Sequence, residues 1–137
     1  MRSGLVVDSS AILAILFNEP EARFFAQAMA GTANLSLSAA NWLETSIRVD
    51  LEGQEGLSHQ FDQLIRHVGI SVIEVSPDQA SVARSAYRVF GKGNGHPAKL
   101  NFGDCFSYAL AKTRNEPLLF KGGDFLHTDL ELLSPSD

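Results

Sequence analysis

The chain contains a single cysteine, Cys105, among its 137 residues. One cysteine excludes an internal disulfide bond, and it also excludes a zinc site built from cysteine thiolates. Because Cys105 falls within the apolar pattern of a predicted helix, we interpret it as a small buried side chain rather than a nucleophile.

Long apolar runs are missing as well. None approaches the ~20 residues that a helix needs to cross a lipid bilayer, so we expect no membrane association. The apolar part of residues 1–10 is too short for a signal peptide and shows no cleavage-site pattern. We therefore expect the protein to stay in the cytoplasm.

Positive charge is scarce, because eleven lysine and arginine residues stand against sixteen aspartates and glutamates, for a formal net charge of -5. This balance argues against a protein that holds nucleic acid by bulk positive charge, which requires clustered cations. It does not exclude a nuclease, since divalent ions held by some of the acids would offset the excess. The cations that could contact phosphates locally lie in the C-terminal half: Lys92, Lys99, Lys112, Arg114 and Lys121.

Short apolar runs, typical of buried parallel strands, alternate with longer stretches that have a helical period. The predicted strands are residues 4–8, 34–39, 70–76, 117–120 and 130–134. The predicted helices are residues 9–18, 19–31, 38–53, 56–69, 77–93 and about 103–114. This order predicts a three-layer α/β/α domain with a central, mainly parallel sheet flanked by helices.

The two consecutive helices after residue 38 imply a small helical hairpin. In the first of them, Leu43, Ile47 and Leu51 recur at i, i+4 and i+8, so they share one helix face. The sequence has no internal repeat and no linker, and residues 92–98 form one glycine-rich loop. We therefore expect residues 1–137 to form a single domain.

Bulky side chains gather on and around the second predicted helix, more than one small sheet obviously needs. They are Phe17, Phe24, Phe25 and Met29. Core packing is the simplest interpretation for any one of them, and an exposed subset would form an interaction surface.

Four acids lie where functional groups gather in open parallel sheets, beyond the C-terminal ends of the strands. Asp8 ends the first predicted strand, and Asp124 follows a later strand and two glycines. Asp104 opens an apolar helix, and Glu44 lies in the first turns of another. The sheet would bring these acids to one edge.

Three of these acids also have purely structural interpretations. Asp104 would complement a helix dipole, worth ~0.3–1 kcal/mol. Glu44 would pair with Arg48 one helical turn later, worth only tenths of a kcal/mol. Asp124 would be a turn residue.

Asp8 would cap the helix after it, worth ~1 kcal/mol, but Ser9 and Ser10 could cap that helix equally well. Several carboxylates at one sheet edge would repel one another and raise their pKa values. A divalent cation removes that conflict. Oxygen ligands without cysteine or histidine favour Mg²⁺ or Mn²⁺ over zinc.

Four segments resemble the acidic motifs of PIN-domain ribonucleases, and in particular those of the VapC-type toxins of bacterial toxin–antitoxin pairs. They are VVDSSAILAIL (residues 6–16), SAANWLE (38–44), LNFGDCFSYALAKT (100–113) and PLLFKGGDF (117–125). The motifs occur in the order of the family, and the resemblance covers essentially the whole chain.

The resemblance implies a PIN-like α/β domain that cuts RNA with Mg²⁺ or Mn²⁺. By motif position, Asp8, Glu44, Asp104 and Asp124 would be the catalytic and metal-binding residues. In the family, such a cluster holds one or two ions that activate water for attack on phosphorus.

The resemblance also implies partners and auxiliary residues. Ser10 is similar to a family hydroxyl position near the acids. Asp129, just past the fourth motif, is either a further auxiliary acid or a turn or strand-edge residue. Family members commonly form homodimers and are neutralised by a small cognate antitoxin, so we expect both partners here besides the RNA substrate.

Two other classes of function compete with this interpretation. A phosphotransfer enzyme would use Asp8 as phosphoryl acceptor, but a haloacid-dehalogenase-like phosphatase needs a second aspartate where this chain has Ser10. The non-enzyme alternative is a catalytically silent PIN-like module that binds RNA or protein. The presence of all four acids favours activity.

Overall fold

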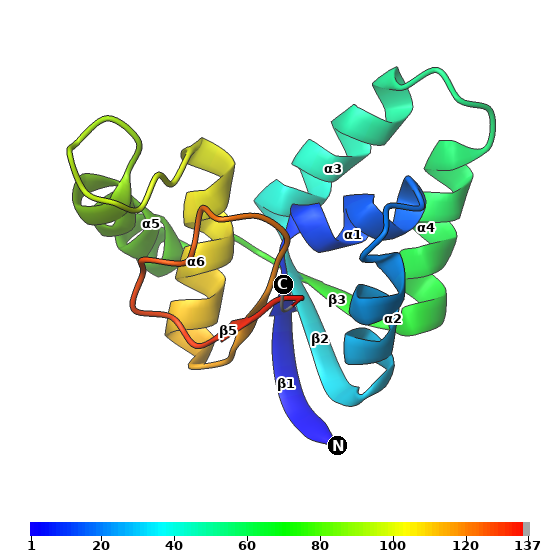
Figure 1. The fold of residues 1–137 in the computed structure, drawn as a ribbon, viewed down its shortest axis with the longest axis horizontal. Helices are drawn as coiled ribbons and strands as arrows, with labels where there is room; N and C mark the ends of the chain where they lie inside the picture. Colours follow the sequence, from blue (N-terminus) through cyan, green and yellow to red (C-terminus); the bar gives the residue numbers. More distant parts are fainter. Residues whose placement is uncertain (136–137) are drawn as a thin grey trace.

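The computed structural model describes residues 1–135 of the chain. Within that range, five strands form one sheet: β1 (Arg2–Val7), β2 (Thr32–Ser38), β3 (Ile70–Ile73), β4 (Leu118–Leu119) and β5 (Leu132–Leu133). The helices are α1 (Ser9–Leu16), α2 (Ala22–Ala30), α3 (Ala39–Leu51), α4 (Leu57–Val68), α5 (Pro77–Phe90) and α6 (Phe102–Arg114). Figure 1 shows their arrangement around the sheet.

The strand order is β3-β2-β1-β4-β5, and every neighbouring pair is parallel. All strands therefore end at the same edge, with β1 in the centre. The prediction of a parallel sheet between helical layers is confirmed. The predicted single domain spans residues 1–137, of which residues 136–137 lie outside the described part.

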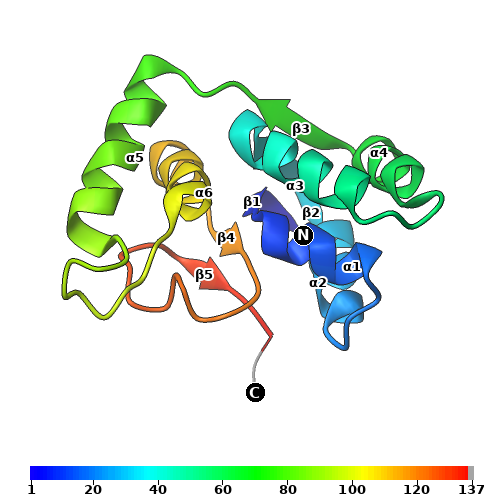
Figure 2. The same ribbon diagram turned by 90° about the horizontal axis from the view of Figure 1, so that it is seen from above.

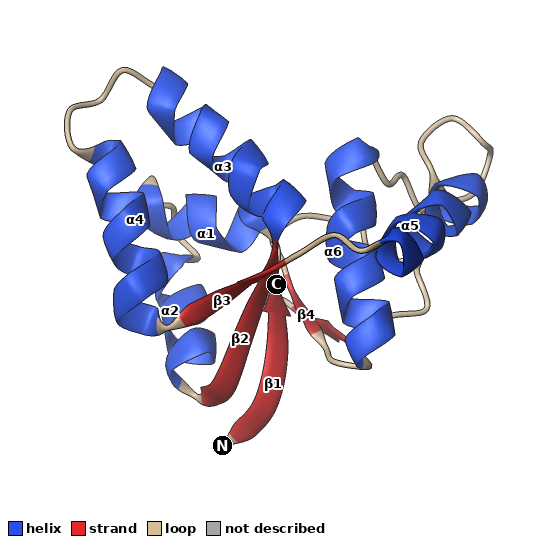
Figure 3. Ribbon diagram, turned by 180° about the vertical axis from the view of Figure 1, so that it is seen from behind, coloured by secondary structure: helices blue, strands red, loops and turns tan. Residues whose placement is uncertain are grey.

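Alternate side chains of β1 pack into two separate apolar cores, one on each face of the sheet. Leu5 and Val7 are buried in the core that includes α1, α2 and α4. Val6, between them, packs in the core that includes α5 and α6. Figures 2 and 3 show these two groups of helices on opposite sides of the strands. Burial on both faces explains why the second half of β1, residues 4–7, is an uninterrupted apolar run.

The predicted hairpin is present as α3 and α4, with α3 also in contact with α1 and α6. Leu43, Ile47 and Leu51 do share one face of α3, but that face is exposed, at 53%, 50% and 80%. The buried residues of α3 are instead Asn41, Thr45 and Val49. The apolar stripe of this helix thus faces away from the core.

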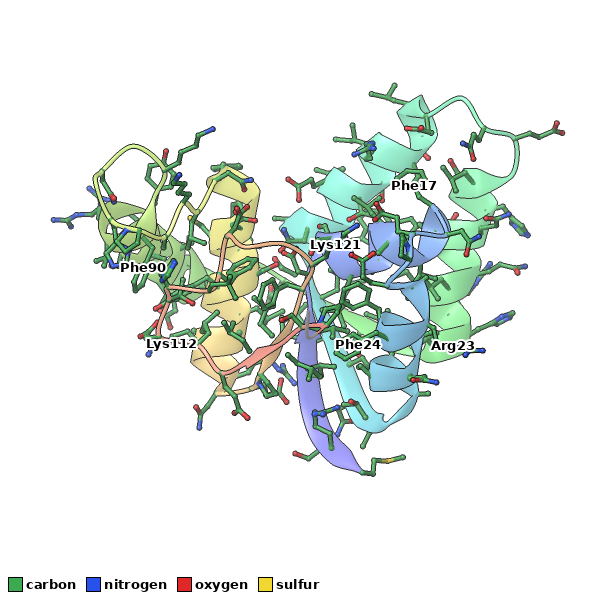
Figure 4. The ribbon with its side chains drawn as sticks, viewed as in Figure 1. Phe17, Arg23, Phe24, Phe90, Lys112 and Lys121 are labelled. Atoms are coloured by element: carbon green, nitrogen blue, oxygen red, sulfur yellow. The ribbon has the colours of Figure 1, made fainter. Side chains whose placement is uncertain are left out.

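The aromatic side chains around α2 are less exposed than an interaction surface requires. Phe25 and Met29 are buried, while Phe17 and Phe24 are half-buried against the same core (Figure 4). Core packing therefore accounts for this group. The large exposed apolar side chains lie elsewhere, chiefly on α3 and at Phe102.

Cys105 is buried on α6, as expected for a small core side chain. Burial, with a smaller contribution from the charge of Asp104, raises the pKa of its thiol to about 11. Such a thiol is protonated and unreactive at neutral pH. Among residues 1–135, no helix is both long enough and apolar enough to pass through a bilayer.

Candidate active site

A polar cleft of about 340 Å³ opens at the C-terminal edge of the sheet. It is bordered by all four predicted acids, Asp8, Glu44, Asp104 and Asp124. These residues come from four separate segments: the end of β1, helix α3, helix α6 and the loop after β4. The parallel topology brings them together, because all of these segments meet the same edge of the sheet.

Asp8 follows β1 directly and is the N-cap of α1, where its side chain accepts a hydrogen bond from the backbone N–H of Ser10. The residue that caps this helix is therefore Asp8, and neither Ser9 nor Ser10 takes that position. Capping and a role in the cleft are compatible, since a helix N-terminus is a favourable place for a carboxylate.

Ser10 connects two sides of the cleft. Its Oγ donates to Asp8 Oδ2 at 2.6 Å and accepts from the backbone N–H of Lys121 at 2.9 Å. The hydroxyl thereby ties the start of α1 to the segment after β4. Its position beside the acids agrees with the location expected of an auxiliary residue.

Asp104 is buried at the third position of α6, where it forms a reciprocal capping box with Asn101. Its pKa is raised from 3.8 to about 8. Burial is the largest cause, the charges and proximity of Asp8 and Asp124 add to it, and the backbone N–H of Asn101 opposes it. Such a shift is typical of a buried carboxylate beside other negative charges.

Glu44 is exposed and points across the cleft towards α6. Ser9 Oγ donates to its Oε1 at 3.2 Å. On the opposite side, Gly103 leaves the room that this carboxylate occupies, because a Cβ at that position would collide with it. Arg48 does not pair with Glu44; it contacts Glu52 at 3.6 Å.

Asp124 and Asp129 have different surroundings. Asp124 is exposed and borders the cleft, and Gly122 before it has a φ of 101°, which favours glycine. Asp129 is not brought to the cleft. It accepts hydrogen bonds from Tyr108 Oη at 2.6 Å and from Lys112 Nζ at 2.8 Å, along α6. Asp129 is thus not among the residues that line the cleft, and its auxiliary role stays a prediction.

Two buried polar residues beside the acids were missed from the sequence, Asn41 and Ser107. Ser107 Oγ lies 2.5 Å from Asp8 Oδ1, although the residues are 99 positions apart. Asn41 Nδ2 donates to the carbonyl of Gly103 at 3.0 Å. Each lies three residues from an acid on the same helix, which is the only signal that the sequence offers.

Of the cations predicted to contact phosphates, only Lys121 lines the cleft within residues 1–135; Lys92, Lys99, Lys112 and Arg114 do not. Lys112 pairs with Asp129, and Arg114 pairs with Glu116. Lys121 borders the cleft, and its Nζ lies 3.0 Å from Glu19 and 3.5 Å from Glu21 (Figure 4). The hydrogen bond with Glu19 is the main cause that raises the pKa of Lys121, so the side chain remains a cation.

The donor set suits a hard divalent cation. As the side chains stand, no three or more His, Cys, Asp or Glu residues in the range 1–135 converge closely enough to hold one ion together. Mg²⁺ does not require such a cage, because it is usually bound through one or two carboxylates and keeps several waters. Four carboxylates without Cys or His in the lining of the cleft, with a buried, charge-crowded Asp104 among them, fit that mode of binding.

Comparison with known proteins agrees with this geometry. Residues 5–131 match the family model of the PIN domain. Ribonuclease VapC28 of Mycobacterium tuberculosis (strain ATCC 25618 / H37Rv) is 49% identical over 127 residues, which cover 93% of this chain and 96% of the relative.

Two solved structures share the fold at low sequence identity. M. tuberculosis VapC20, a sarcin–ricin loop cleaving toxin, has a TM-score of 0.74 and 14% identity, covering 92% of this chain and 95% of its own. A toxin–antitoxin complex from Klebsiella pneumoniae has a TM-score of 0.69 and 18% identity, covering 97% and 98%. With the family match and the 49% identical relative, the chain belongs to the PIN-domain family and, within it, to the VapC ribonucleases.

Proposed function

We propose that this protein is the toxin of a toxin–antitoxin pair and that it hydrolyses RNA phosphodiester bonds with Mg²⁺ or Mn²⁺. The observation that carries the proposal is the cleft in which four carboxylates, from four separate segments, meet in a member of the VapC ribonucleases. All four acids that such chemistry requires are present, which disfavours a catalytically silent module.

In this proposal, Asp8 and Asp104 are the principal metal ligands. Asp124 completes the site directly or through water, and Glu44 binds metal or positions the attacking water. When bound, a divalent cation lowers the pKa of water and neutralises charge at the phosphate. No side chain acts as a covalent nucleophile.

The raised pKa of Asp104 supports a cation at this position. A carboxylate with a pKa of about 8 is mostly protonated at neutral pH in the metal-free protein. A metal ligand must be deprotonated, so a cation and a proton compete for the same oxygen. We therefore expect metal binding to release a proton from Asp104 and to strengthen as the pH rises towards 8.

Two cations at the border of the cleft are suited to hold the RNA backbone. Lys121 is fixed by Glu19 and Glu21, and Arg48 lies over the ring of Phe17 at 5.1 Å. Fixed cations next to the acids would contact phosphates flanking the scissile bond. Both already pair with carboxylates, Lys121 with Glu19 and Glu21 and Arg48 with Glu52, so an RNA phosphate would compete with these pairs.

The regulation of such a nuclease requires an inhibitor. A structural relative is itself a toxin–antitoxin complex, and we propose that this protein likewise binds a small cognate antitoxin. The protein would then bind both its RNA substrate and its antitoxin in the cytoplasm.

The test is cleavage of a mixed pool of structured RNAs by antitoxin-free protein. We expect cutting with Mn²⁺ or Mg²⁺ and none with EDTA, because the carboxylates alone cannot activate water. Restoring the metal after chelation should restore cleavage. Cutting that persists in EDTA would contradict the metal-dependent mechanism, and a folded, metal-bound protein that cuts no RNA would favour a binding module.

A homodimer is the second assembly that we propose, through the exposed apolar face of α3 and α6. A groove of about 480 Å³ between these helices is lined mainly by apolar side chains, Leu43, Ile47, Phe102 and Phe106, and also by Glu44. Phe102 is 78% exposed, although it stacks on the ring of Phe106 at 4.9 Å. A contiguous apolar surface of this kind favours association over solvation.

Ile47→Glu should convert the dimer to a monomer, because it places a charge in the apolar interface. Light scattering coupled to size-exclusion chromatography would measure the mass. Val89→Glu is the matched control, since Val89 is 52% exposed on α5, outside this groove. A wild-type monomer would contradict the dimer and would leave the α3–α6 face to another partner.

A further inference from the structure

Ser107 is completely buried, yet its hydroxyl contacts a charged group. Its Oγ lies 2.5 Å from Asp8 Oδ1 and 3.0 Å from Asn41 Oδ1. A hydroxyl carries one proton, and the shorter contact to an ionised oxygen is the stronger one. Ser107 therefore donates to Asp8.

The hydrogen bonds of Asp8 distinguish its two carboxylate oxygens. Oδ2 accepts from Ser10 twice, from the backbone N–H at 3.0 Å and from the hydroxyl at 2.6 Å. Within the described residues 1–135, Oδ1 accepts only from Ser107. Because a carboxylate oxygen has about two acceptor sites, Oδ2 is filled and Oδ1 keeps one free. The oxygen held by Ser107 is thus the one with capacity for a further ligand.

Asn41 keeps Ser107 within reach of Asp8. Its buried amide donates to the carbonyl of Gly103 at 3.0 Å, which fixes the first turn of α6 against α3. Ser107 lies one helical turn after Gly103. Ser9 Oγ contacts the backbone carbonyl of Asn41 at 3.3 Å, so the start of α1 is joined to the same contact.

We infer that Ser107 is a positioning residue that orients the free acceptor site of Asp8 Oδ1 towards a divalent cation, with Asn41 as its support. This inference rests on the proposed function. A hydroxyl that fixes the plane of a ligating carboxylate reduces the reorganisation needed when the ion binds, and loss of such outer partners typically costs about 10–100-fold in metal affinity or activity.

The test compares Mn²⁺ binding by the intact protein and its Ser107→Ala variant, measured by isothermal titration calorimetry. We expect the dissociation constant to rise roughly 10–100-fold in the variant. The kcat of RNA cleavage should fall while KM for RNA changes little, because Ser107 is completely buried and does not itself contact RNA. Ser107→Thr keeps the hydroxyl and should recover most of the affinity.

Ser38→Ala is the matched control. Ser38 is equally buried at the end of β2, but its Oγ has no hydrogen-bond partner within residues 1–135. Its replacement should leave Mn²⁺ binding unchanged. Equal Mn²⁺ affinity in Ser107→Ala and Ser38→Ala would overturn the positioning role while the proposed function stands. A wild type that binds no Mn²⁺ would overturn the proposed metal mechanism and this inference with it.

Discussion

Replacing Asp104 by asparagine should lower metal-dependent RNA cleavage by roughly 10²–10³-fold, because one metal ligand contributes several kcal/mol of transition-state stabilisation. Asparagine has nearly the same shape and retains a carbonyl oxygen for the N–H of Asn101. The capping box of α6 should therefore survive. The loss would be measured as the cleavage rate at saturating Mn²⁺ beside the wild type.

The same substitution should stabilise the metal-free protein at high pH. The pKa of Asp104 is 3.8 ordinarily and about 8 in the folded chain, so the folded state binds more protons between these values. Stability contributed by this group is complete below pH 3.8 and is lost as the pH rises through 8. The asparagine variant does not titrate there.

Urea unfolding in EDTA at pH 5 and pH 9 would measure this difference. The free energy of unfolding of Asp104→Asn, relative to that of the wild type, should increase by a few kcal/mol from pH 5 to pH 9, since each pKa unit is worth about 1.4 kcal/mol. Saturating Mn²⁺ should reverse the order by stabilising the wild type alone. An advantage that does not change with pH would contradict the charge crowding at Asp104.

The second large effect concerns Asp8, in which capping and metal binding can be separated. Asp8→Asn and Asp8→Ala should both lower cleavage by about 10²-fold or more, because both remove the charge that binds the cation. Only the alanine variant loses the acceptor for Ser10 at the start of α1. It should be less stable by about 1–2 kcal/mol.

Asparagine at this position can satisfy its neighbours. The asparagine oxygen would accept from Ser10, and its amide would donate to Ser107 Oγ. The Ser107 hydroxyl would then donate its hydrogen bond to Asn41 Oδ1, which lies 3.0 Å away. Unfolding should be measured at pH 6, where Asp104 is still protonated and does not repel Asp8. Equal free energies of unfolding for the two variants would contradict the capping role of Asp8. Retained cleavage in Asp8→Asn would contradict its role as a metal ligand.

The order of strands and helices, the parallel sheet and the set of four acids could all be predicted from the sequence. Apolar runs and helical periods are local patterns, and a strand buried on both faces is apolar throughout. The C-terminal ends of parallel strands share one edge, so Asp8 and Asp124 could be placed there without coordinates. Asp104 and Glu44 were predicted there from their positions at helix starts, and the family motifs then implied a catalytic role for all four acids.

The tertiary structure alone decided which surfaces and partners these elements use. The helical period of the sequence shows that Leu43, Ile47 and Leu51 share one face of α3. Whether that face is buried or exposed depends on where the neighbouring helices lie, and here it is exposed. Asp129 is bound by Tyr108 and Lys112 for the same reason, because they occupy the nearest side of α6.

The support of the acid cluster was equally invisible in the sequence. Ser107 reaches Asp8 across 99 residues, and Asn41 reaches Gly103 across 62. No local pattern encodes contacts at such separations, since they depend on how α3, α6 and β1 pack together. The sequence by itself determined which acids this protein has, and the packing of its helices decided how they are held.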